Sequence, residues 1–201
     1  ENGDPLWYMD EKDANKNPTG RRVTTNDYSS ADYYYVNKSS LPKVYGGFNT
    51  SLSWKGFDLS AIFAYSIGGY IYNRDITMIL HNGSLEGRDW STEILRRWTP
   101  DNRYTDVPAL STTSNNWNSA STRFLQNNSY MRLKNLTLSY NLPKQWISKL
   151  SLSSVQVYVQ GDNLFSIHRN QGLDPEQGIT GITYYRYPAM RTISGGINVS
   201  F

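Results

Sequence analysis

Five long segments of the sequence alternate apolar and polar residues with a period of two. In the first of them, Phe48 and Leu52 share one parity, whereas Asn49 and Ser51 share the other. This period is typical of a strand with one apolar and one polar face. Each segment has roughly 11 to 16 residues, whereas soluble strands average about five or six and a bilayer-crossing strand needs about 9–11. The segments are 43–55, 57–72, 129–141, 154–167 and 189–201.

Short and long connections alternate between these segments. Lys55-Gly56 forms a tight turn, and Pro143 begins one helical turn in the short connector 142–153. The long connections are 73–128, with a short helix expected between Asp89 and Pro100, and 168–188. Transmembrane β-barrels have this asymmetry, with short periplasmic turns and long extracellular loops. We therefore predict an all-β fold, an antiparallel transmembrane β-barrel segment in 43–201, with extracellular loops at 1–42, 73–128 and 168–188.

One of these segments changes parity in its middle. Met131 and Leu133 occupy odd positions, whereas Leu136 and Leu138 occupy even ones. A one-residue slip would otherwise reverse the two faces, so we predict a β-bulge at Lys134-Asn135.

The last eight residues also alternate, and they end on an aromatic ring. Ser194, Gly196, Val199 and Phe201 have the spacing of the C-terminal assembly signal of bacterial outer-membrane proteins. An ordinary edge strand that ends in Phe is the alternative. If Phe201 marks the periplasmic interface, the directions of the other strands follow by alternation, and aromatic girdles are expected at both ends. The expected girdles are Trp54, Phe57, Tyr140 and Phe201 at one end, and Tyr70 or Tyr72, Tyr130, Phe165 and Tyr187 at the other.

Composition excludes several classes of function. The net charge of +3 comes from 20 basic and 17 acidic residues without a basic patch, so no nucleic-acid binding is expected. Cysteine is absent, which excludes disulfides and thiolate chemistry. His81 and His168 have no nucleophile at a recognised spacing, so we predict no enzyme and no cofactor. The chain starts without Met or a signal peptide, so it is expected to be processed or part of a longer protein.

Candidate contact residues lie in the long connections. Flat rings suit stacking on sugars or packing on a partner protein, although packing within the loops is favoured for most of them. The candidates are Trp90, Trp98, Tyr104, Trp117, Tyr184 and Tyr185. Asp10 and Asp13 supply carboxylate oxygens and are a weak candidate for a Ca²⁺ site. They lack the spacing of a calcium-binding loop, so a solvated polar loop is favoured.

A series of short stretches along the sequence matches a known family in order and spacing. They are Ser40–Lys43, Tyr45–Asn49, Phe57–Ser60, Arg97–Pro100, Ser129–Tyr140, Leu142–Lys144, Asp162–Phe165, Gly172–Glu176 and Tyr187–Pro188 with the terminal strand. Through them, nearly the whole chain resembles the C-terminal part of SusC/RagA-family TonB-dependent outer-membrane transporters. The resemblance implies the last five strands of a 22-stranded barrel, completed by the remaining strands and an internal plug. It also implies energy from the TonB system, a SusD-type surface lipoprotein as partner, contact with outer-membrane lipid, and import of glycans or peptides. The location would be the outer membrane of a Gram-negative bacterium like the Bacteroidota.

Two other functions are also compatible with the sequence. A soluble β-sandwich that binds glycans would have shorter strands, with turns about every 8–12 residues. An outer-membrane barrel with a structural or adhesive role would have the same strands without importing a nutrient. The sequence does not distinguish glycan from peptide cargo.

Overall fold

The computed structural model describes residues 2–81, 83, 85, 87–111, 116–170, 172–176 and 178–201. The predicted loops 73–128 and 168–188 therefore include positions outside the described residues. The chain divides into two compact units, which are described separately. The first comprises Glu1–Asn37 and Tyr72–Leu125, and the second comprises Lys38–Ile71 and Gln126–Phe201.

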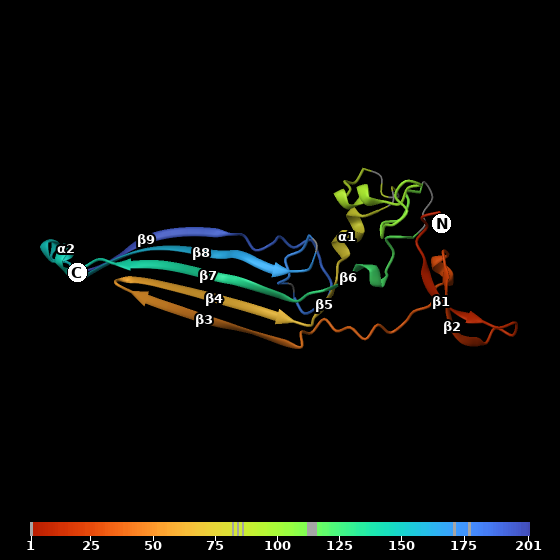
Figure 1. Cartoon of the computed structure of the whole chain (residues 1–201), viewed down its shortest axis with the longest axis horizontal. Helices are drawn as coiled ribbons and strands as arrows, with labels where there is room; N and C mark the ends of the chain where they lie inside the picture. The colour runs from red at the N-terminus through yellow and green to blue at the C-terminus, as the bar shows by residue number, and fades with distance from the viewer. Residues whose placement is uncertain are drawn as a thin grey trace. The chain divides into compact units, whose positions relative to one another are not determined.

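The second unit is built on one antiparallel sheet of five long strands (Figure 1). Their order in space is β3-β4-β7-β8-β9, so strands that follow one another in this series are hydrogen-bonded neighbours. The all-β antiparallel fold predicted from the sequence is confirmed. The strands are β3 (Val44–Trp54), β4 (Phe57–Ile67), β7 (Tyr130–Asn141), β8 (Ser154–His168) and β9 (Thr192–Ser200).

The second long strand is shorter than its alternation predicted. β4 ends at Ile67, because Gly68 adopts a φ of 91° that breaks the extended backbone. The residues that continue the predicted segment form β5 (Tyr70–Tyr72), which pairs instead with the short strand β6 (Leu125–Asn127) in a separate sheet.

The bulge predicted in β7 is confirmed. Ile62 and Phe63 are adjacent in β4, yet they pair with Asn135 and Leu133, so Lys134 is an extra residue. The register between β7 and β8 shifts at the same place. The bulge keeps Leu133 and Leu136 on one face although their parities differ.

The pairing gives the sheet one polar face and one apolar face. Asn49, Asp58, Ser139 and Gln156 belong to the polar face, as the cross-strand register shows. The larger side chains of the opposite face are mostly exposed, from 39% for Leu59 to 76% for Ile193. An exposed contiguous apolar surface of this kind marks a binding or membrane surface rather than the exterior of a soluble monomer. The exposed members of the apolar face are Val44, Phe48, Leu52, Trp54, Phe57, Leu59, Ile67, Leu138, Val157, Val159, Phe165, Ile167, Ile193, Ile197 and Val199.

One end of the sheet carries the tight turns. Lys55 and Gly56 connect β3 to β4, and both have positive φ. The helical turn predicted after Pro143 is confirmed as α2 (Lys144–Ile147), followed by the 3-10 turn η4 (Ser148–Leu150) between β7 and β8. Figure 1 shows α2 and the C-terminus at this same end of the sheet.

The aromatic side chains predicted for the two girdles gather at one end of the sheet only. At the turn end, Phe57 pairs with both Trp54 and Tyr140 on the apolar face, and the Phe57 and Tyr140 ring centroids are 4.5 Å apart. At the other end the prediction was wrong for Tyr130, which pairs with Ser66 on the polar face. The bulge is the reason, because Tyr130 lies beyond it and follows the opposite parity.

Further members of the second predicted girdle lie outside the long sheet. Tyr70 and Tyr72 are in β5, and Tyr187 is an exposed loop residue. Phe165 in β8 lies on the apolar face as expected, because it pairs with Leu133.

The first unit combines a hairpin with short helices. Its hairpin, β1 (Trp7–Lys12) and β2 (Pro18–Thr25), lies within 1–42, where only a loop was predicted. Its helical elements are η1 (Tyr28–Ser30), α1 (Arg74–Ile79), η2 (Thr92–Arg96) and η3 (Thr122–Phe124). Ile94, Val107 and Trp117 form its buried apolar cluster.

The helix predicted between Asp89 and Pro100 is a short 3-10 helix, η2. Its N-cap is Ser91, whose side chain accepts a hydrogen bond from the Glu93 amide. Glu93 forms an ion pair with Arg96, three residues on, because a 3-10 helix aligns such side chains. Across the described part of the chain, no helix has the length and apolarity needed to cross a membrane.

Candidate functional site

The polar face of the sheet carries hydrogen bonds that join strands across it. Near the turn end, Asp58 accepts a hydrogen bond from the Asn141 side chain at 2.7 Å, linking β4 to β7. Gln156 extends this network, because its amide donates to Ser139 and its oxygen accepts from Asn198 in β9. Polar side chains that satisfy one another in this way can face water without loosening the sheet.

A second polar group lies beside the bulge. Asn135 donates to Asp162 at 2.8 Å, and Thr137 donates to the Asn135 oxygen at 2.9 Å. Gln160 donates to both oxygens of the Asp162 carboxylate. The bulge therefore leads directly into an ordered polar surface on β7 and β8.

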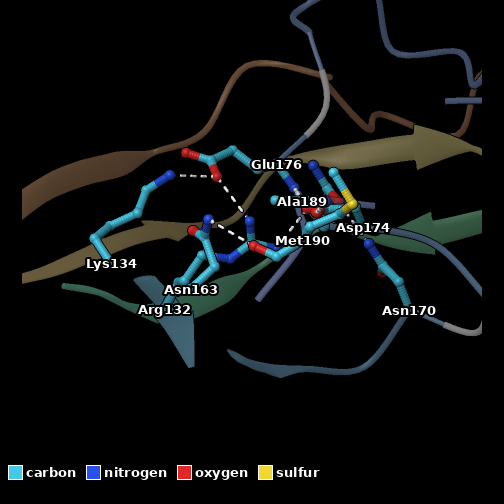
Figure 2. Close-up of polar contacts among 9 residues, drawn as sticks. Arg132, Lys134, Asn163, Asn170, Asp174, Glu176, Ala189 and Met190 are labelled. Carbon is cyan, nitrogen blue, oxygen red and sulfur yellow. Dashed lines mark hydrogen bonds and ion pairs between the residues drawn. The ribbon is translucent and has the colours of Figure 1, made fainter. Parts of the chain in front are cut away.

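At the bulge and just before it, two basic side chains of β7 contact two carboxylates of the loop between β8 and β9 (Figure 2). Arg132 binds Asp174 at 2.5 Å through one terminal nitrogen and Glu176 at 2.9 Å through the other. Lys134 binds the same Glu176 oxygen at 2.6 Å. The side chains of Arg132 and Asp174 are only 5% and 7% exposed, so this ion pair is buried. We call these four residues the loop anchor.

Asp174 also holds the backbone on both sides of the loop. Its carboxylate accepts hydrogen bonds from the amides of Ala189 at 2.7 Å and Glu176 at 2.9 Å. Burial raises the pKa of Asp174, but these amides and the Arg132 guanidinium outweigh that effect and leave the pKa below its ordinary value. The carboxylate is therefore charged at neutral pH, and it fixes two distant points of the loop to the sheet.

Asparagine side chains add two further attachments of the same loop. Asn163, which adopts a φ of 51°, donates to the Met190 carbonyl at 3.3 Å. Asn170 is buried and donates to Asn128 at 2.5 Å. Asn163 thus ties Met190 to β8, and Asn170 ties the start of the loop to Asn128, which precedes β7.

The loop anchor was not among the sequence-predicted site residues. The available signals were two cations at alternate positions of a strand, Arg132 and Lys134, and two acids at alternate positions of a loop, Asp174 and Glu176. Such a pattern indicates that charges can face one side, but it does not indicate which segments meet.

The predicted contact residues of the first unit differ widely in accessibility. Trp117 is 3% exposed in the buried cluster, and the Arg123 guanidinium lies 5.3 Å from its ring centroid. Trp98 packs against Gly3, since an added Cβ on Gly3 would lie 2.5 Å from the Trp98 ring. Trp90 donates its indole N–H to Nδ1 of His81 at 3.1 Å but is 44% exposed, and Tyr104 is fully exposed. Packing therefore accounts for Trp117 and Trp98, whereas Tyr104 presents its whole ring.

In the second unit, the predicted contact residues Tyr184 and Tyr185 are 57% and 67% exposed. Tyr185 has a φ of 44°, an uncommon conformation for a bulky residue. The assembly-signal residues Ser194, Gly196 and Val199 lie in β9, and Phe201 follows it with 91% of its surface exposed.

The weak calcium candidate has a structural role in the first hairpin. The Asp13 carboxylate accepts the amides of Asn15 and Asn17 and so closes the turn between β1 and β2. Asp10 accepts the Tyr34 hydroxyl at 2.8 Å. No group of three potential metal-ligating side chains of His, Cys, Asp or Glu occurs among the residues that the structure describes.

Comparisons with known proteins identify the family. No family model matches the chain. TonB-dependent receptor P3 of Formosa agariphila is 34% identical over 166 residues, 77% of this chain. TonB-dependent receptor SusC of Bacteroides thetaiotaomicron is 28% identical over 168 residues, 83% of this chain. A solved structure of the RagAB peptide importer in the "open-open" state matches all of this chain, with 34% identity and a TM-score of 0.81. The chain belongs to the SusC/RagA family of TonB-dependent receptors.

The SusC/RagA relatives are much longer than this chain. The chain covers 16% of receptor P3, 16% of SusC and 21% of the matched RagAB chain. A second RagAB structure, in the "closed-closed" state, gives a TM-score of 0.79 at 35% identity over 99% of this chain. The resemblance predicted from the sequence motifs is confirmed, and the two-faced sheet and its loops belong to a SusC/RagA-type receptor.

Proposed function

We propose that this chain forms the C-terminal wall of an outer-membrane importer, as the last five strands of a 22-stranded barrel. The exposed apolar face carries this proposal, because a single sheet with such a face requires lipid or a covering layer. The polar face would then line the lumen. The match to RagAB over the whole chain supports this orientation of wall and loops.

The same proposal assigns the ends of the sheet. Phe201 and the tight turns would lie at the periplasmic side, and 1–42, 73–128 and 168–188 would be extracellular. Tyr104, Tyr184 and Tyr185 have the most exposed rings of the predicted contact set, so they are the residues proposed to touch cargo or partner. Trp90, which is 44% exposed, would contribute a weaker contact, whereas Trp98 and Trp117 would contribute through the fold of their unit.

Import would proceed without covalent change to the cargo. A SusD-type lipoprotein and the outer loops would trap a glycan or a peptide, and a plug driven by TonB would open the path. The similarity of this chain to SusC and to the RagAB peptide importer supports this class of activity. The remaining strands, the plug and the TonB-contacting segment are proposed to be supplied by the rest of a longer protein.

The two alternatives make different demands on the sheet. A soluble β-sandwich buries its apolar face against a second sheet, whereas here that face is exposed in Leu52 and Ile193 alike. The exposed face therefore disfavours the sandwich. A structural or adhesive barrel would have the same face, so only a transport experiment separates it from an importer.

The test is deletion of the gene for the full-length receptor in its native bacterium. We expect loss of growth on one glycan or peptide source, with growth on simple sugars and amino acids unchanged. Restoring the gene should restore growth. Unchanged uptake of every glycan and peptide source would contradict the importer and favour the structural role.

A further inference from the structure

Three lysines lie at the turn end of the long sheet, in the two connections found there. Lys55 belongs to the β3–β4 turn, whereas Lys144 belongs to α2 and Lys149 to η4, between β7 and β8. The Asn141 amide donates a hydrogen bond to the Gly56 carbonyl at 2.8 Å, so the start of the second connection lies against the first. All three lysines are exposed. We call Lys55, Lys144 and Lys149 the turn lysines.

No acidic side chain neutralises the turn lysines. The second unit has ten basic but only four acidic side chains. Asp58 is the acid closest to the turns, and its carboxylate accepts hydrogen bonds from Ser53 and Asn141 on the polar face. The other three acids lie beside the bulge and in the loop anchor. The turn lysines form no ion pair with any residue that the structure describes, so their charge is available to a partner.

Exposed tryptophans accompany these charges. Trp54, at the end of β3, is 65% exposed, and Nζ of Lys55 lies 5.0 Å from the centroid of its ring. Trp146 in α2 is 64% exposed, whereas Ile147 beside it is buried, so α2 is packed on its unit and still presents a ring. Trp54 also pairs with Phe57 on the apolar face. The apolar face therefore continues into an end that carries both rings and positive charge.

This combination of groups fits an anionic lipid surface. Tryptophan rings favour the level at which the hydrocarbon of a bilayer meets its headgroups. A lysine can lay its alkyl stem along apolar surface while its ammonium group reaches a phosphate. An acidic protein would match the charges but would leave the adjoining apolar face uncovered.

We propose that the turn lysines bind the phosphate groups of anionic phospholipids, with Trp54 and Trp146 at the boundary of the hydrocarbon. The inference rests on the proposed function, because it needs the sheet to stand in a bilayer. It adds a preference for one class of headgroup, which import by itself does not require.

The experiment is native mass spectrometry of the full-length receptor in detergent, titrated with lipid. The probes are dioleoyl phosphatidylglycerol, which is anionic, and dioleoyl phosphatidylcholine, which is zwitterionic and has the same chains. We expect the receptor to retain phosphatidylglycerol at an about tenfold lower concentration, since each lysine near an anionic headgroup adds to its binding. The triple variant Lys55→Gln/Lys144→Gln/Lys149→Gln should lose most of this preference.

Two matched variants show whether charge at this place is the cause. Replacing all three turn lysines by arginine keeps the charge and should keep the preference. The control Lys43→Gln/Arg169→Gln/Arg186→Gln removes three exposed charges of the same unit outside the turns and should also keep it. If the triple turn variant folds poorly, Lys144→Gln/Lys149→Gln leaves the β3–β4 turn unaltered and should still lose part of the preference.

Equal retention of the two lipids by the unaltered receptor would overturn the proposal. So would a preference that survives in the triple turn variant, or one that falls equally in the control variant. Binding of poly-glutamate at the turn lysines without any preference for phosphatidylglycerol would assign an acidic protein partner instead. These results leave the growth phenotype of the gene deletion unaffected, so this proposal and the proposed function fail separately.

Discussion

Asp174→Asn is the substitution that most directly tests how the loop between β8 and β9 is held. The change keeps the shape of the side chain and one oxygen that can accept the Ala189 amide. It removes the negative charge that faces Arg132 at 2.5 Å. Arg132 would then remain buried, with only the partly exposed Glu176 as its anionic partner.

The expected cost follows from burial. Removing one member of a buried ion pair costs about 3–5 kcal/mol, because the remaining charge stays desolvated. Glu176 still compensates part of the Arg132 charge. We therefore expect Asp174→Asn to lower the free energy that holds the loop closed by about 3 kcal/mol, the low end of this range. Glu176→Gln should cost about 1 kcal/mol or less, since Glu176 is 35% exposed and water can replace it. The two variants remove one negative charge each and are therefore matched.

Amide hydrogen exchange of the full-length receptor measures this difference locally. A loss of about 3 kcal/mol accelerates exchange about 100-fold for amides that are protected by loop closure. Ala189 is the reporter, because its amide bonds to Asp174. Amides of β3, far from the loop along the sheet order, should keep their exchange rates and serve as the internal control.

Exchange at Ala189 that rises by the same factor in Asp174→Asn and Glu176→Gln would refute the reasoning. Such a result would mean that the buried pair does not hold the loop. Unchanged exchange in both variants would lead to the same conclusion.

Three further predictions concern the anchor, the strands and the terminus. The pKa of Asp174 is lower in the folded protein than in the unfolded chain. Its carboxylate therefore stabilises the closed loop fully above the unfolded pKa of about 3.9, and this stabilisation is lost as the pH falls through the lower pKa of the folded state. Ala189 exchange, corrected for intrinsic rates, should thus stay flat from neutral pH to about 5 and rise only below about 4. Val157→Arg should lower the free energy of unfolding by about 2–4 kcal/mol if Val157 faces lipid, whereas Gln156→Arg should be mild; equal losses in urea titrations of the reconstituted receptor would contradict the faces. If the exposed ring of Phe201 serves assembly, Phe201→Ser should reduce the amount of receptor in the outer membrane; normal levels in membrane fractions would exclude that role.

The long strands could be predicted from the sequence because each has one apolar face and one polar face. Alternation at Phe48 and Leu52 therefore has a direct physical cause, and it survives in the structure. The bulge at Lys134 was predictable for the same reason. The position of Tyr130 was not predicted, because its ring was assigned by its place near a strand end rather than by its parity.

The remaining parts depend on contacts between distant residues. Arg132 and Asp174 are separated by 42 positions, so no local period indicates that they meet. The β1–β2 hairpin was not predicted, because β2 is polar and almost wholly exposed. Its sequence therefore shows no alternation of apolar and polar residues. Trp117 resembled a ligand-contact residue in sequence, but burial beside Ile94 and Val107 depends on how its loop folds back.

The bulge also determines how any residue-by-residue probing of β7 must be designed. Before the bulge, Met131 and Leu133 place the odd positions of β7 on the apolar face. From Leu136 onward the even positions lie on that face. A cysteine scan that assumes one parity along the strand would assign half of its labels to the wrong side. The same strand presents Lys134 and Asn135 to the polar side in succession, so two neighbouring labels there would report the same environment.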